Sequence, residues 1–243
     1  MIISKTNDLL TNSLAVIAGS VLSGNIAYAK DPNFGLTVSS SSSTFTFVCG
    51  AANNVDYIAL HGVTVPVGGV VTVSGSGYSD SYTSTSIDDR NIVFYLSSPV
   101  NIASLQISIT GSGIKRIGFI AAGQAATVPH GTSAGQDLYY LGYNAKSRTS
   151  VNEQGAPVLR TQVPTAPKLR ITIKNVLKSW VRDDFKAITT LYARQGVLSI
   201  LDYEDDGRPN ESVAGFELDG VDVKTHSQTL ALVDVSFNVR VSV

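Results

Sequence analysis

The sequence predicts a mainly β protein, an antiparallel β-sandwich followed by a smaller α+β lobe with one helix. Short apolar stretches of strand length recur between residues 34 and 120, and glycines and polar residues separate them. A convincing helical period occurs once, after residue 178. Charged residues make up 15% of the 243 residues, below the roughly 25% usual for soluble domains, and the chain is rich in Ser, Thr, Gly and Val.

Residues 34–122 are expected to form the sandwich domain. Within Ile102–Ile109, apolar and polar residues alternate as a half-buried strand requires. Gly68-Gly69 predicts a hairpin between Val63–Val67 and Val70–Val73, and Gly111-Ser112-Gly113 predicts a second turn. The candidate strands are Phe34–Ser39, Thr44–Cys49, Val55–Leu60, Val70–Val73, Asn91–Leu96, Ile102–Ile109 and Ile114–Ile120. Short strands at this spacing favour an antiparallel sandwich or jelly roll.

The stretch Ser74–Asp89 is polar and lacks apolar periodicity, so we expect a long loop there. Tyrosine offers both an apolar ring and a hydroxyl group, which suits contact with a sugar or a protein. The alternative is a solvated loop without a partner. The candidate glycan or partner contacts are Tyr78, Asp80, Tyr82 and Asp88.

Residues 1–33 form a separate N-terminal segment. Its apolar run Leu14–Leu22 and the small residues Ala27-Tyr28-Ala29 resemble parts of a signal peptide. However, Lys5 and Asp8 leave no net positive charge before the run, and polar residues interrupt it. We therefore expect no signal peptide and no membrane span, which needs about 20 apolar residues. The segment is expected to pack on its own sheet or on a neighbouring subunit.

Residues 123–167 are rich in proline and glycine and predict an extended linker that wraps a neighbour or joins two lobes. Proline lacks the backbone N–H that a strand donates to its neighbour, and glycine weakens strand interiors. Long regular elements are therefore not expected. Tyr139–Tyr143 is a candidate short strand.

Residues 168–243 predict the α+β lobe. Apolar and polar residues alternate in Lys168–Val176, which predicts a strand with one solvent-exposed face. The strands expected after the helix are Val197–Leu201, Ser212–Leu218, Val221–Thr225 and Thr229–Val243. Ser179 is the expected N-cap of that helix and Gly196 its C-cap glycine. A basic face is a candidate subunit interface or simply a solvated face. Its members are Lys168, Arg170, Lys174 and Arg182.

The residues predict no enzyme and no cofactor. The single Cys49 allows neither an internal disulfide nor a cysteine zinc cluster and is expected to be buried. No serine motif accompanies His61, His130 or His226, so these three are expected to be structural or surface histidines. Asp202–Gly207 begins like a calcium loop, but its twelfth position is Val213, which favours a solvated acidic loop over a cation site. A net charge of −1 argues against nucleic acid as the main partner.

Three short stretches resemble structural proteins of tailed bacteriophages that carry a galactose-binding-like (discoidin-like) sandwich. Val55–Gly62 (VDYIALHG) resembles a strand and turn of that domain, and Lys115–Gly123 (KRIGFIAAG) resembles a later strand. Phe237–Val243 resembles the closing strand of the C-terminal lobe in those proteins. The chain departs from the pattern at Gly62-Val63, where the family more often has asparagine after the histidine.

The resemblance implies a minor tail, baseplate or tail-tip protein that assembles with copies of itself and with other virion proteins, and therefore a location in the virion. Low charge is in keeping with surface that becomes buried in a symmetric assembly. The alternative is a carbohydrate-binding module that recognises host surface glycans through the Tyr78–Tyr82 region. An enzyme is the third hypothesis, which no motif supports.

Overall fold

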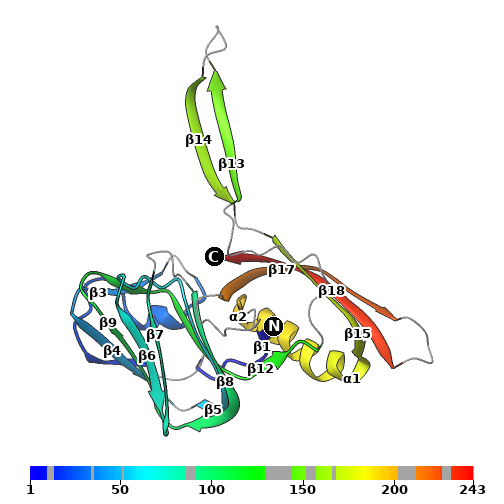
Figure 1. Ribbon diagram of the computed structural model, residues 1–243, viewed down its shortest axis with the longest axis horizontal. Coiled ribbons are helices and arrows are strands. Elements are labelled where there is room, and N and C mark those ends of the chain that lie inside the picture. The colour runs from blue at the N-terminus through cyan, green and yellow to red at the C-terminus, as the bar shows by residue number, and fades with distance from the viewer. Residues whose placement is uncertain are drawn as a thin grey trace.

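A computed structural model describes residues 1–9, 14–33, 36–50, 52–85, 91–129, 144–151, 157–165, 168–201, 212–225 and 231–242. It confirms the predicted mainly β fold class: an antiparallel β-sandwich is followed by a smaller lobe of sheet and helix (Figure 1). The strands of every sheet that the structure describes pair in antiparallel fashion.

The sandwich consists of two main sheets. The five-stranded sheet has the order β2 (Leu14–Ala18), β4 (Thr44–Cys49), β9 (Leu105–Thr110), β6 (Val70–Gly75) and β7 (Tyr78–Thr83). The three-stranded sheet has the order β11 (Phe119–Gly123), β5 (Ala52–His61) and β8 (Asn91–Ile102). A two-stranded ladder of β3 (Val38–Ser40) and β10 (Lys115–Ile117) and a 3-10 helix, Ile26–Lys30, complete this half.

The sandwich core lies between these two sheets. Phe45, Phe47 and Ile107 from the five-stranded sheet are fully buried together with Ile58 and Phe94 from the three-stranded sheet. Burial of such side chains contributes about 1.5–3 kcal/mol each to folding. Cys49 is buried in the same core, and burial raises the pKa of its thiol to about 12, so it is an apolar core residue as expected.

The second lobe is a six-stranded sheet that residues from both ends of the chain build. Its order is β12 (Ala125–Thr127), β1 (Ile2–Ser4), β16 (Leu198–Leu201), β17 (Ser212–Thr225), β18 (Leu232–Ser242) and β15 (Lys168–Leu177). The N-terminal segment therefore packs on sheets of its own chain, through β1 here and through β2 in the sandwich. The expected separate strands Ser212–Leu218 and Val221–Thr225 are one strand with bulges.

One helical stretch covers the face of this sheet that points away from the sandwich. It comprises α1 (Lys178–Trp180), a π-helical segment (Val181–Phe185) and α2 (Lys186–Gln195). Gly196 ends it in the left-handed region with φ 70°, as predicted. The predicted N-cap, Ser179, is wrong: Leu177 is the cap, and no side chain caps the helix. The Lys178 N–H instead donates to the Ala231 carbonyl, which satisfies one of the free donors at this end.

The three-stranded sheet is buried on both faces. Ile58 and Leu60 of β5 point into the sandwich core, whereas Tyr57, Ala59 and His61 point toward the second lobe. On that side Ile2 and Leu201 of the six-stranded sheet complete a third apolar cluster. The molecule is therefore layered as five-stranded sheet, three-stranded sheet, six-stranded sheet and helix, which explains why β5 and β11 lack polar–apolar alternation.

Two expectations about turns are corrected by the sheet pairing. Val63–Val67 is not a strand: only Thr64 forms a bridge, with Arg116, so Gly68-Gly69 does not form the predicted hairpin. The predicted loop Ser74–Asp89 is instead largely the β6–β7 hairpin. Ser76 and Gly77 both have positive φ, which is the backbone of a two-residue hairpin turn.

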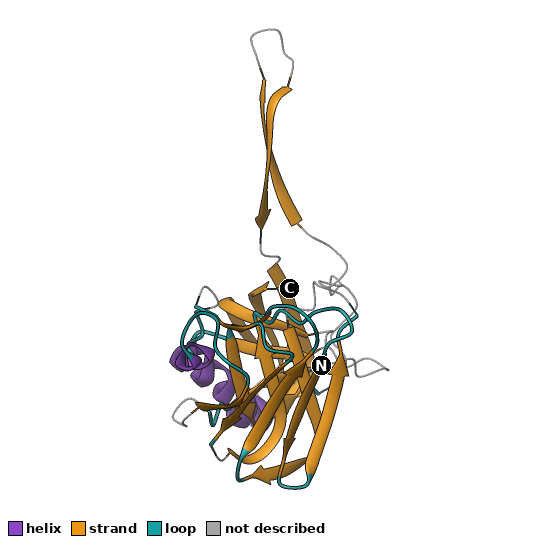
Figure 2. Cartoon of the chain, turned by 90° about the vertical axis from the view of Figure 1, so that its left-hand side faces the viewer, coloured by secondary structure: helices purple, strands orange, loops and turns teal. Residues whose placement is uncertain are grey.

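The proline-rich region contains a long hairpin, contrary to the expectation of no long regular elements. β13 (Asn144–Val151) and β14 (Pro157–Thr165) pair with each other and with no other strand that the structure describes. Figures 1 and 2 show this hairpin projecting from the body. Each strand of an isolated pair has one open edge, where proline needs no ladder partner, so Pro157 and Pro164 are tolerated. Tyr139–Tyr143 lies outside the described residues.

Candidate functional site

The predicted contact residues of the β6–β7 hairpin lie on an edge strand. Tyr78, Asp80 and Tyr82 alternate along β7, which ends the five-stranded sheet. The Tyr78 hydroxyl donates to Asp80 Oδ2 at 3.3 Å, and the Ser81 N–H donates to Asp80 Oδ1 at 2.7 Å. Burial, followed by the nearby Asp80 charge, raises the pKa of Tyr78. Asp88 lies outside the described residues.

This edge presents a limited surface to a ligand. The rings of Tyr78 and Tyr82 are half-buried and pack against the sandwich core, whereas Asp80 is exposed. The structure therefore brings three of the four predicted residues together. It places the two aromatic rings along the edge of the sheet, where each keeps part of its surface exposed.

The predicted basic face is divided between two surfaces. Arg170 and Lys174 are exposed on β15, where the residues that alternate with them, Leu169 and Ile171, face the helix. Arg182 is exposed on the helix, which covers the opposite face of the sheet. Lys168 begins β15. Arg182 therefore does not share one surface with Arg170 and Lys174.

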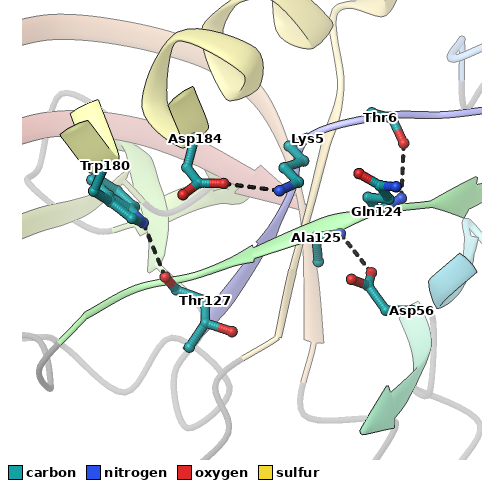
Figure 3. A network of polar contacts seen from close by, with 8 residues as sticks. All are labelled: Lys5, Thr6, Asp56, Gln124, Ala125, Thr127, Trp180 and Asp184. Atoms are coloured by element: carbon teal, nitrogen blue, oxygen red, sulfur yellow. Dashed lines mark hydrogen bonds and ion pairs between the residues drawn. The ribbon is translucent and has the colours of Figure 1, made fainter. Parts of the chain in front are cut away.

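A polar cleft of about 460 Å³ separates the N-terminal segment from the helix. No short stretch of sequence predicts this cleft, because its two walls are nearly 180 residues apart. Lys5 Nζ lies 2.9 Å from Asp184 Oδ1 and joins those walls (Figure 3). Both signs of charge line the cleft. The charged lining residues are Lys5, Asp8, Arg182, Asp183, Lys186 and Arg194.

Hydrogen bonds hold residues 124–127 in place beside this cleft (Figure 3). The Gln124 N–H donates to Thr6 Oγ1 at 2.8 Å, and the Ala125 N–H donates to Asp56 Oδ1 at 2.6 Å. A Cβ on Gly123 would lie 2.7 Å from the Thr6 carbonyl oxygen, so only glycine permits this approach. On the helix side, Trp180 Nε1 donates to the Thr127 carbonyl at 3.1 Å. Hydrogen bonds and close packing therefore hold the chain segments around the cleft in place.

His61 forms a buried bridge between the two lobes. Its Nδ1 lies 2.9 Å from Asn91 Oδ1, its Nε2 lies 2.8 Å from Ser199 Oγ, and its ring stacks on Phe119. Serine, histidine and asparagine in this order resemble a nucleophilic triad. All three side chains are buried, however, and a nucleophile needs access to its substrate. The contacts therefore act as a structural link, in keeping with the expectation for His61; His130 and His226 lie outside the described residues.

The buried imidazole makes stability depend on pH. Burial lowers the pKa of His61 from 6.5 to about 4, and the hydrogen bond that its Nδ1–H donates to Asn91 Oδ1 opposes that shift only in part. The folded state binds the proton less well than the unfolded chain does. Stability from the neutral ring is therefore complete above pH 6.5 and is lost as pH falls toward 4, by roughly 3 kcal/mol.

Between pH 7 and pH 4, we expect the free energy of unfolding of the wild-type chain to fall by roughly 3 kcal/mol more than that of a His61→Gln variant. Urea unfolding at several pH values in this window measures the free energy of both proteins. The variant starts less stable at pH 7, and the gap should narrow by roughly 3 kcal/mol at pH 4. Parallel pH profiles for the two proteins would contradict the assignment.

The residues that the structure describes contain no candidate metal cluster and no candidate membrane-spanning helix. None of them forms a group of three or more His, Cys, Asp or Glu side chains that could hold a metal ion. The acidic segment Asp202–Gly207 lies outside the described residues, so the preference for a solvated acidic loop over a cation site stays a prediction. Within the described part of the chain, no helix is long and apolar enough to cross a membrane.

Comparison with known proteins gives matches in structure alone. No protein-family model matches the sequence, and no curated protein matches it either. Solved structures that resemble about half of the chain include the family 32 CBM of C. perfringens NanJ in complex with galactose. That match has a TM-score of 0.39 and 12% identity and covers 48% of this chain and 97% of the module.

Two further solved structures resemble a similar share of the chain. A Streptococcus pneumoniae fucose binding module, SpX-3, has a TM-score of 0.33 and 11% identity over 48% of this chain and 96% of its own. The lectin domain of lectinolysin, complexed with Lewis B antigen, has a TM-score of 0.38 and 6% identity over 50% of this chain and 99% of its own. Likenesses of this degree concern the arrangement of strands and leave the ligand of this chain open.

Proposed function

We propose that the chain is a structural component of a tailed-phage virion that acts through protein–protein assembly and not as an enzyme. The β13–β14 hairpin is the observation that carries this proposal, because it pairs with no other described strand and projects from the body (Figure 2). A two-stranded hairpin alone is marginally stable in water, so a partner that covers it or extends it is needed. Open strand edges are suited to such pairing.

The virion setting is supported by the resemblance of Val55–Gly62, Lys115–Gly123 and Phe237–Val243 to tailed-phage structural proteins. The first two stretches form β5 and β10–β11 at the centre of the layered fold. Both stretches contribute buried residues to the core of the fold, and the resemblance implies an assembly role for the chain as a whole. The proposed location is the tail, tail tip, baseplate or connector region.

Sedimentation velocity of the full chain over a wide concentration range tests the assembly proposal. We expect species larger than the 25.6 kDa monomer that gain population as concentration rises. Each association has a defined stoichiometry if the copies close into a symmetric ring. A monomer at every concentration, in a chain that is also absent from purified particles, would contradict the proposal.

A second candidate is recognition of a host surface glycan through β7. The observation that favours it is the arrangement of Tyr78, Asp80 and Tyr82 on one edge strand, with Asp80 exposed beside the Tyr78 hydroxyl. The names of similar structures mention galactose, fucose and Lewis B as ligands of those proteins. In this chain, an exposed carboxylate next to a half-buried ring would recognise sugar hydroxyl groups.

A glycan array with the isolated chain separates the two candidates. Saturable binding that is lost in Tyr82→Ala and in Asp80→Asn would support glycan recognition. Asp80→Asn is the sharper variant, because it removes the charge of an exposed residue and leaves the packing of the rings intact. Binding that is equally strong in both variants, or absent throughout, would exclude β7 as the site.

A further inference from the structure

An apolar groove of about 330 Å³ lies beside the start of the helix, where β17 ends. Three valines supply its apolar surface and three basic side chains supply its charge. The valines are Val181, Val223 and Val233, and the basic residues are Lys178, Arg182 and Lys186. The basic residues follow one another at intervals of four along the helix, so they lie on one helical face. The groove is thus an apolar floor beside a row of cations.

Exposed apolar side chains of β17 add to this surface. Val223, which lines the groove, is 43% exposed, and Val221, two residues before it, is 47% exposed. Contiguous exposed apolar surface with a charged border is typical of a protein interaction site. The occupant of this groove should therefore offer an apolar group.

The charge of the groove points to an acidic occupant. Among the described residues, no carboxylate forms an ion pair with Lys178, Arg182 or Lys186. The neighbouring Asp184 pairs with Lys5 beside the polar cleft, which Arg182 and Lys186 also line. A segment that combines carboxylates with an aromatic ring would match both parts of the surface.

Such a segment occurs in this chain. Residues 202–206 read Asp-Tyr-Glu-Asp-Asp, four carboxylates around one tyrosine, within the connection from β16 to β17. A tyrosine ring buries about 150–250 Å² of surface at an interface. The carboxylates on either side of it would then lie beside the cations of the groove.

The segment cannot occupy the groove of its own chain. It joins Leu201 to Ser212, at one end of β17, whereas the groove lies at Thr225, at the other end of that 14-residue strand. At 3.3 Å per residue the strand spans ~40 Å. A ten-residue connection that is held at both ends reaches at most ~17 Å from them. The occupant must therefore come from a different copy.

We propose that the groove binds the Asp202–Asp206 segment of a second copy of this chain. The inference rests on the proposed assembly function and specifies the contact between copies. Donor and acceptor lie at opposite ends of the same strand, so the contact is head-to-tail. A head-to-tail contact generates a ring if its rotation closes and a filament if it does not.

A labelled synthetic peptide of residues 201–212 tests the site on the full-length chain by fluorescence anisotropy. We expect saturable binding that weakens as salt is raised, because the contacts are between charges. Lys178→Glu together with Arg182→Glu should weaken binding at least ~10-fold. Arg194→Glu is the matched control, since Arg194 is exposed on the same helix but does not line the groove, and it should leave binding unchanged.

Two results would overturn the inference. One is the absence of saturable binding up to about 1 mM peptide. The other is equal binding of a peptide in which Asn and Gln replace the acids, because the groove would then select no charge. If the chain assembles but the peptide does not bind, this contact is wrong while the assembly proposal stands. If the peptide binds but the chain stays monomeric at every concentration, the groove accepts this sequence but does not join two copies, so the inference and the assembly proposal fail together.

Discussion

Replacing Lys115 with methionine is expected to lower the free energy of unfolding by about 3–5 kcal/mol. Lys115 is fully buried on β10, and its ammonium donates to three backbone carbonyls. The distances are 2.7 Å to Ser42 O, 2.6 Å to Gly111 O and 3.0 Å to Gly113 O. Methionine keeps the aliphatic stem but leaves these acceptors without their donor. The lysine therefore ties the turn after β9 to the segment before β4.

Urea unfolding followed by circular dichroism measures this loss. Arg116→Met is the matched control, because Arg116 is the next residue of the same strand but is exposed. We expect it to change stability by no more than about 0.5 kcal/mol. Equal, small effects of the two substitutions would show that the buried ammonium does not hold these turns together.

Replacing residues 144–165 with a short Gly-Ser linker is expected to weaken self-association at least roughly 100-fold, which corresponds to about 2.7 kcal/mol. The thermal midpoint should change little, because β13 and β14 pair with no other described strand. Removal of the hairpin would thus separate assembly from folding.

A milder variant locates the contact within the hairpin. Shortening only the connection 152–156 to Asn-Gly keeps both strands and removes the tip. If the strand edges make the contact, this variant should associate like the wild type. Sedimentation velocity compares the three proteins. Unchanged association of the deletion variant would remove the hairpin from the assembly mechanism.

The sequence correctly predicted those strands and helix ends that are determined by residues within or directly next to the element. Thr44–Cys49 was predicted with the bounds that β4 has, and Gly196 marked the end of the helix. The helix start was misplaced because Ser179 has the side chain of an N-cap, whereas the Ala231 carbonyl accepts the Lys178 N–H. A backbone partner more than 50 residues away leaves no local signal.

Pairing between strands that are distant in sequence explains the other differences between the expected and the observed strands and turns. Ile2–Ser4 pairs with β12 and β16, so one sheet joins three distant parts of the chain, and no short pattern encodes this. The β6–β7 hairpin was missed because the side chains of β7 that face outward, and not its inward tyrosines, dominate its composition. Gly68-Gly69 has hairpin chemistry, but the preceding Thr64 pairs with Arg116.

The candidate site was predicted only where it depends on one strand. Tyr78, Asp80 and Tyr82 were found because they are close in sequence, and β7 keeps them together. Sequence patterns did not predict the polar cleft, the His61–Ser199 contact or the apolar groove beside the helix. Each of them joins residues from distant segments, so the fold had to be known before the chemistry could be found.

Cryo-electron microscopy of intact phage particles tests the proposed assembly role. We expect this chain to be present in several symmetry-related copies, with β13–β14 lying against a neighbouring chain. Particles that lack the chain, or copies of it whose hairpin contacts no other protein, would contradict it.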